Sequence, residues 1–127
     1  RAPSAWDAPT GEAVEAAVQL YFDGLYEGDV AKLGRVFHPR ASLFIAAEGE
    51  LIVLPVPQWL ERVANRPSPA STQAARDDAI LMIDRVGPVN ALVKVRCMLP
   101  PTTYTDHLSF IECEGRWQIV AKSYCKT

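Results

Sequence analysis

The chain of 127 residues suits one compact domain, because protein domains cluster at about 100–150 residues. Hydrophobic residues make up 49% of the sequence and charged residues 22%, an ordinary globular composition, and a formal net charge of −2 gives no electrostatic basis for binding nucleic acid. No apolar run approaches the roughly 20 residues of a membrane span, so we expect a cytoplasmic protein whose partners include neither nucleic acid nor a membrane.

The N-terminal part is predicted to form an arm and a long helix. Residues 1–10 contain two prolines and are expected to be a loosely held arm. Because the sequence starts at Arg1 and not at Met, it is compatible with a leader that has been cleaved off. Thr10 is the expected N-cap of a helix over residues 11–27, where apolar residues recur at helical spacing, and Gly28 is expected to close it. Residues 11–127 are predicted to form the single domain.

Two short helices are predicted next. Asp29 is expected to cap a second helix whose apolar side includes Phe37, and Pro39 is expected to end that helix. Pro57 suits the first turn of a third helix over QWLERVANR, since the fixed φ of proline matches the helical value.

The remaining segments are predicted to be antiparallel strands. Two short runs around Gly49 indicate a first hairpin, and four longer runs follow in hairpin series. The order of elements predicts the α+β class, with a strongly curved antiparallel sheet that forms a cone over three N-terminal helices. The predicted strands are residues 41–46, 51–54, 80–86, 91–99, 104–112 and 116–124.

The stretch YTDHLSF at residues 104–110 places an aspartate among apolar neighbours. Successive side chains of a strand point to opposite faces, so Asp106 shares a face with Leu108 and Phe110, whereas His107 points the other way. Moving an unpaired carboxylate out of water is costly. Asp106 is therefore expected to lie at the wet end of its strand, to be hydrogen-bonded, or to be carried in its neutral form.

Several stretches of the sequence resemble one known superfamily. The runs VQLYFDGLYEGDVAKLGRVFHPRASL, YTDHLSF and GRWQIVAKSY are similar to the nuclear-transport-factor-two-like superfamily, most closely to its putative lumazine-binding and SnoaL-like branch. The resemblance covers residues 12–125. It implies a cystatin-like α+β barrel, in which a curved antiparallel sheet wraps around a helix layer and encloses one apolar pocket, and a homodimer packed through the outer sheet face. The fold does not by itself choose among the enzymes and non-catalytic adaptors that share it.

A partial resemblance to ketosteroid isomerases bears on individual residues. It places Tyr21 at that enzyme's oxyanion-hole tyrosine and Asp106 at its oxyanion-hole aspartic acid, which the enzyme keeps protonated in an apolar site. It places Ile45 where the enzyme has its general-base aspartate, and isoleucine cannot move a proton. The resemblance thus implies Tyr21 and Asp106 as the catalytic pair and leaves the general base unassigned.

These residues also have purely structural interpretations. Tyr21 fits a core aromatic residue whose hydroxyl is satisfied by a neighbour, and Asp106 fits an acceptor that only orders the mouth of a pocket. The other residues that we expect to line the pocket are large apolar groups, for which core packing is the default. They are Leu25, Ile45, Trp59, Val63, Leu108, Phe110 and Trp117.

The leading hypothesis is a small-molecule pocket protein whose partner is a small apolar, cyclic compound, with Tyr21 and Asp106 polarising its carbonyl group. As an enzyme it would be a cofactor-free isomerase, cyclase or dehydratase, and therefore an isomerase or a lyase. The alternative is a non-catalytic ligand-binding or dimeric protein-interaction module. Three cysteines without CxxC spacing and two histidines far apart supply no metal-ligand motif, so we expect neither a metal nor a cofactor.

Overall fold

The computed structural model describes residues 8–127, with side chains described from Ala13 onward. It has three α-helices and one sheet of six strands, which confirms the predicted α+β class. The elements are α1 (Ala8–Glu27), α2 (Val30–Val36), β1 (Phe37–Ala47), β2 (Glu50–Pro55), α3 (Val56–Ala64), the 3₁₀ turn η1 (Ala70–Thr72), β3 (Ala79–Val86), β4 (Asn90–Leu99), β5 (Thr102–Cys113) and β6 (Arg116–Lys126).

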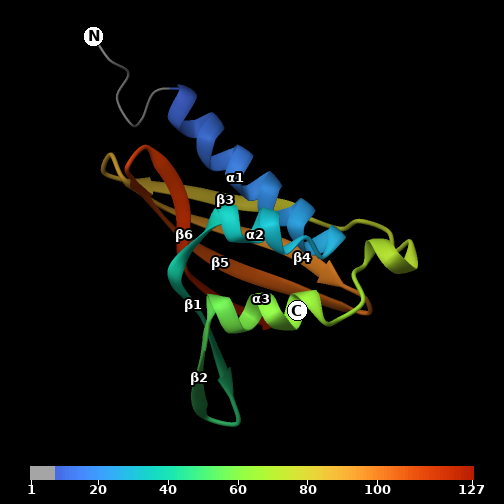
Figure 1. The fold of residues 1–127 in the computed structure, drawn as a ribbon. Helices are drawn as coiled ribbons and strands as arrows, with labels where there is room; N and C mark the ends of the chain where they lie inside the picture. Colours follow the sequence, from blue (N-terminus) through green and yellow to red (C-terminus); the bar gives the residue numbers. More distant parts are fainter. Residues whose placement is uncertain (1–7) are drawn as a thin grey trace.

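The sheet is curved but open. Its strand order is β2-β1-β6-β5-β4-β3, so β2 and β3 form two free edges and the predicted barrel does not close. All neighbouring strands are antiparallel except β1 and β6, which run parallel, so the prediction of a wholly antiparallel sheet is wrong at this pair. The parallel pair arises because the chain leaves the β1–β2 hairpin through α3, crosses to the opposite edge and returns by hairpins. Figure 1 shows the three helices on one side of the sheet and the β1–β2 hairpin projecting beyond them.

The start of α1 differs from the prediction. The helix begins at Ala8, three residues early, so Thr10 lies inside it and is not its N-cap. The rest of the predicted arm, residues 1–7, lies outside the described residues. Asp29 caps α2 as predicted, because its Oδ1 accepts hydrogen bonds from the backbone N–H groups of Ala31 at 3.0 Å and Lys32 at 3.1 Å.

The second helix ends earlier than predicted. Phe37 has extended backbone angles and begins β1, so Pro39 lies within that strand and does not terminate the helix. The reason is tertiary packing, since the Phe37 ring lies 5.8 Å from the Tyr21 ring and 5.1 Å from the Trp59 ring, both at edge-on angles. A helical Phe37 would give up these contacts.

The hydrophobic core lies between the helix layer and the inner face of the sheet. Val14, Val18 and Leu33 contribute from the helices, and alternate residues of β4 and β5 contribute from the sheet. This alternation fixes which side chains of each strand point toward α1. Within residues 8–127, no helix is both long and apolar enough to cross a membrane.

Gly28 links α1 to α2 in a conformation that resists substitution. Its φ is +67°, and a Cβ atom added there would lie 3.0 Å from the Cβ of Ser68. Gly28→Ala is expected to lower the free energy of unfolding by about 1–3 kcal/mol, because a left-handed alanine costs energy and the added methyl is crowded. Gly87→Ala is the matched control, since Gly87 has a φ of +65° with nothing within 4 Å of a Cβ. Equal losses in urea unfolding would contradict a cost from the Ser68 contact.

Candidate functional site

Asp106 is buried on the inner face of β5. The residue is 1% exposed and pairs in register with Val95 of β4 and Tyr124 of β6. It shares its face with Leu108 and Phe110, both fully buried, as the alternation of the strand predicts. The carboxyl group is therefore not at the wet end of its strand, and its neighbours must compensate for the loss of water.

The first compensation comes from Tyr21 of α1. Its hydroxyl donates a hydrogen bond of 2.5 Å to Oδ2 of Asp106, so the structure brings together the two residues singled out in the sequence. Such a short O–H···O distance is typical of a hydrogen bond to a charged acceptor. Burial and the adjacent carboxylate raise the pKa of Tyr21 well above its ordinary value, so the phenol keeps its proton and remains a donor.

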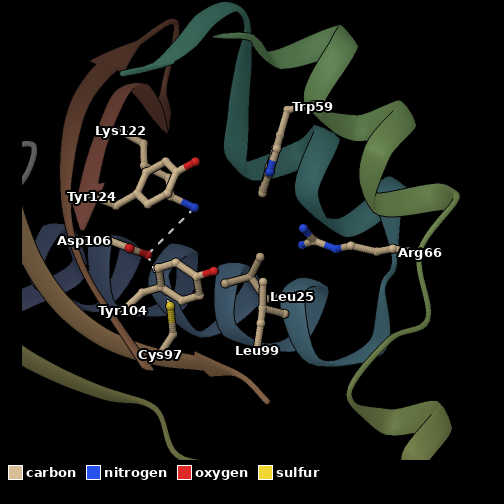
Figure 2. Close-up of a pocket in the computed structure, with 9 residues that line it drawn as sticks. All are labelled: Leu25, Trp59, Arg66, Cys97, Leu99, Tyr104, Asp106, Lys122 and Tyr124. Atoms are coloured by element: carbon tan, nitrogen blue, oxygen red, sulfur yellow. Dashed lines mark hydrogen bonds and ion pairs between the residues drawn. The ribbon is translucent and has the colours of Figure 1, made fainter. Parts of the chain in front are cut away.

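Two further groups approach the same oxygen. Lys122 of β6 lies opposite Leu108 in the register, is 6% exposed, and places its Nζ 3.8 Å from Oδ2 of Asp106 (Figure 2). The Sγ of Cys97, on β4, donates to Oδ2 at 3.3 Å. Oδ1 of Asp106 differs from Oδ2, because it is buried without a hydrogen-bond partner among the described residues. The carboxyl group thus has one oxygen held in place and one oxygen unsatisfied.

The ammonium group of Lys122 is surrounded by aromatic rings. Its Nζ lies 4.8 Å from the ring centroids of Trp59 and Tyr124 and 5.3 Å from that of Tyr21. Ring faces attract a cation at such distances, most strongly where water is excluded. The rings and the Asp106 carboxylate together hold a buried positive charge next to a buried negative one.

Asp106 and Lys122 line a cavity of about 60 Å³. A water molecule needs about 10–15 Å³ of such space, so the cavity holds roughly four to six water-sized groups. Drug-sized ligands occupy pockets of about 300–1,000 Å³, so a fused-ring compound enters this cavity only if its walls move. The other lining residues, drawn in Figure 2, are Leu25, Trp59, Arg66, Cys97, Leu99, Tyr104 and Tyr124.

The residues expected to line a pocket are divided between the cavity and the core. Leu25 and Trp59 line the cavity. Tyr21 lies behind Asp106, fully buried and absent from the lining, so it contacts the carboxyl group and not the open space. Four further expected residues do not line this cavity, because their side chains fill the space between sheet and helices or pack against it: Val63, Leu108, Phe110 and Trp117.

Ile45 lies at a separate hollow. This hollow measures about 370 Å³ and is also lined by Thr105 and His107, which alternate with Asp106 along β5. The hollow therefore reaches the outer face of the sheet, although Tyr124 lines both it and the inner cavity, and Ile45 does not line the inner cavity. A homodimer through this outer face stays a prediction.

Sequence reasoning missed Lys122 and Arg66. Lys122 alternates onto the same face of β6 as Tyr124. A lysine on a strand ordinarily extends its charge into water, so its sequence context did not indicate a buried ammonium group. Only the pairing of β6 with β5, which places Lys122 opposite Leu108, shows that it points inward. Arg66 follows α3 in an irregular segment, where no periodic pattern indicates a direction. Cys97 is buried like a small hydrophobic residue and also donates a hydrogen bond to Asp106.

The cysteines are expected to differ strongly in reactivity toward a thiol reagent. Cys97 is buried, and burial followed by the adjacent Asp106 charge raises the pKa of its thiol, so it stays protonated at pH 8, whereas Cys113 and Cys125 are exposed. Titration of the native protein with a chromogenic disulfide should therefore modify two thiols rapidly and the third only on unfolding. The Cys97→Ser variant is the control, which should lose only the thiol that reacts on unfolding. Rapid reaction of all three thiols would contradict the closed site.

Comparisons with known proteins agree with this architecture. The family described as putative lumazine-binding matches residues 9–125. The chain is 25% identical over 115 residues to a protein named aldolase FrzH from a Cladobotryum species, covering 89% of this chain and 88% of that protein.

Two solved structures show the same fold. An NTF-2 like protein of unknown function from Silicibacter pomeroyi DSS-3 superposes with a TM-score of 0.82 at 24% identity, covering 94% of this chain and 98% of its own. An NTF2-like protein of unknown function from Shewanella baltica OS155 gives a TM-score of 0.84 at 21% identity, with coverage of 95% and 96%.

Proposed function

Because the chain belongs to the putative lumazine-binding family of the nuclear-transport-factor-two-like superfamily, we propose that its cavity binds a small carbonyl compound and that Asp106 exchanges a proton with it. The observation that carries the proposal is the state of the Asp106 carboxyl group. Its Oδ2 accepts from Tyr21 and Cys97, while its buried Oδ1 lacks a partner and lies in a residue that lines the cavity. Buried polar atoms are ordinarily satisfied, so an exception calls for an explanation, and a catalytic role is one of those that account for such atoms.

The proposed step is removal of a proton from the carbon next to the carbonyl group. The Asp106 carboxylate takes the proton, the C–H electron pair forms a C=C bond, and the carbonyl oxygen becomes an enolate oxyanion. The Lys122 ammonium, held 3.8 Å from Asp106, supplies the positive charge that stabilises the oxyanion. Return of the proton to carbon restores the ketone. Asp106 thus serves as the base that Ile45 cannot provide, and Tyr21 acts as a positioning residue.

The named relative supports this class of reaction. Aldolases, as a class, make or break a carbon–carbon bond at the carbon next to a carbonyl group. This reaction requires a carbanion equivalent at the carbon next to the carbonyl group. An enolate formed by Asp106 is such a species, and a second carbonyl compound would accept its electron pair in place of a proton. The 25% identity over most of both chains makes a shared C–C or C–H chemistry a natural starting hypothesis.

The proposal is tested by proton exchange in heavy water. Pyruvate is a small probe whose methyl protons exchange for deuterium through its enolate, and the native protein should accelerate this loss of ¹H NMR signal above the buffer rate. Leu99→Trp should abolish the acceleration because Leu99 lines the cavity. Leu92→Trp adds the same bulk to the other face of β4 and should leave the acceleration intact.

The outcomes separate the two functional hypotheses. If pyruvate raises the Tm of the native protein, and Leu99→Trp removes that effect, but no exchange occurs, the alternative of a non-catalytic ligand-binding module is favoured. If neither pyruvate nor other small ketones bind or exchange, the proposed function is wrong.

A further inference from the structure

Arg66 brings a second positive charge to the cavity. It follows α3 in the chain, is half-buried, and lines the cavity together with Asp106 and Lys122. Figure 2 shows its guanidinium extending into the space opposite those two residues. Burial lowers the pKa of Arg66 from its ordinary value, as expected for a cation that has lost water, but a guanidinium remains protonated at neutral pH.

Arg66 has no anionic partner in the described part of the chain. None of the ion pairs and side-chain hydrogen bonds there includes its guanidinium, although five N–H donors are available on such a group. Asp106 is the one carboxylate among the described residues that line the cavity, and it is already paired with Lys122 and Tyr21. The described lining therefore holds two cations against one anion.

A neighbouring hollow shows the same excess of positive charge. It measures about 290 Å³, shares Arg66 and Leu99 with the cavity, and is otherwise lined by proline and hydroxyl residues of the segment after α3 and by Pro100. None of the described residues that line it carries a carboxylate. Arg66 thus lies between the inner cavity and the outer hollow, and none of the described residues that line either space pairs its positive charge with a carboxylate.

We infer that the ligand carries a small anionic group, a carboxylate above all, which pairs with Arg66 while its carbonyl group reaches Asp106 and Lys122. This inference rests on the proposed function and narrows it, because the substrate class becomes small oxo acids rather than the neutral apolar ketones expected from the sequence. The planar fork of a guanidinium matches the two oxygens of a carboxylate and gives it a preferred orientation. Tyr104 and Tyr124 add two hydroxyl-bearing rings to the same lining.

The test compares two probes that differ in charge and not in shape. Pyruvate and pyruvamide share the ketone and the number of non-hydrogen atoms, but only pyruvate is an anion. Dissociation constants from NMR titration of the native protein should favour pyruvate by about tenfold or more, the scale of a hydrogen bond to a charged group. Arg66→Gln should bring the two constants to within about twofold of each other.

Arg62→Gln provides the matched control. Arg62 is exposed on α3, four residues before Arg66, so this variant removes the same charge without touching the cavity and should keep the preference for pyruvate. Both variants should unfold at temperatures close to that of the native protein, because neither arginine is fully buried.

The outcomes distinguish this inference from the function on which it rests. If pyruvamide binds and exchanges its methyl protons as well as pyruvate does, or if Arg66→Gln keeps the preference, the anion site is refuted and the proton-exchange function stands. If neither probe binds or exchanges, both proposals are refuted. A preference for pyruvate that disappears in Arg66→Gln and persists in Arg62→Gln supports the oxo-acid assignment.

Discussion

Asp106→Asn is expected to lower the rate of pyruvate proton exchange by about 10²–10⁴-fold, the contribution typical of a positioned general base. The amide has nearly the shape of the carboxyl group and can still accept a hydrogen bond from Tyr21, but it cannot take up a proton at neutral pH. The rate constant at saturating pyruvate is the quantity to compare, measured at a temperature where circular dichroism shows the variant folded.

Tyr21→Phe separates chemistry from positioning in the same assay. It leaves the carboxylate but removes the 2.5 Å hydrogen bond that orients Oδ2, and misplacing the base in this way is expected to lower the rate by about 10- to 100-fold. The loss should therefore be smaller than for Asp106→Asn. If Asp106→Asn exchanges protons as fast as the native protein, Asp106 is a structural acceptor and the proposed base is wrong.

Lys122→Met is expected to destabilise the fold by about 3–5 kcal/mol, because it leaves the Asp106 carboxylate buried beside an apolar side chain. Methionine has nearly the length of lysine and fits among the same aromatic rings, so the change removes charge and little volume. Domains of this size are stable by about 5–15 kcal/mol, so the loss is a large fraction of the total. Urea unfolding of the native and variant proteins measures it.

A double-mutant cycle attributes that loss to the buried pair. Asp106→Asn alone leaves the Lys122 ammonium without its carboxylate and should also destabilise the protein. Combining Asp106→Asn with Lys122→Met removes both charges, so the double variant should be more stable than the sum of the single losses predicts. Additive losses would contradict a direct interaction across the 3.8 Å between Nζ and Oδ2.

Local sequence signals predicted the elements but not how the sheet is assembled. The caps at Gly28 and Asp29 and the alternation of β5 depend on neighbours within a few residues, and each has the predicted conformation or burial. The parallel pairing of β1 with β6 depends on a chain crossover, which leaves no periodic trace in either strand. Phe37 is a second case that local signals do not predict. Its spacing favours a helix, but packing against aromatic rings from distant elements places it in a strand.

An aspartate and apolar side chains share one face of β5 for a reason that is visible in the sequence, because strand geometry sets that alternation. The surroundings of Asp106 depend on the folded chain. Its partners come from α1, β4 and β6, and the cation opposite comes from the segment after α3, so they meet only when the chain has folded. Water is excluded where these groups meet, so their charges interact strongly. This arrangement cannot be read from the spacing of the residues along the chain.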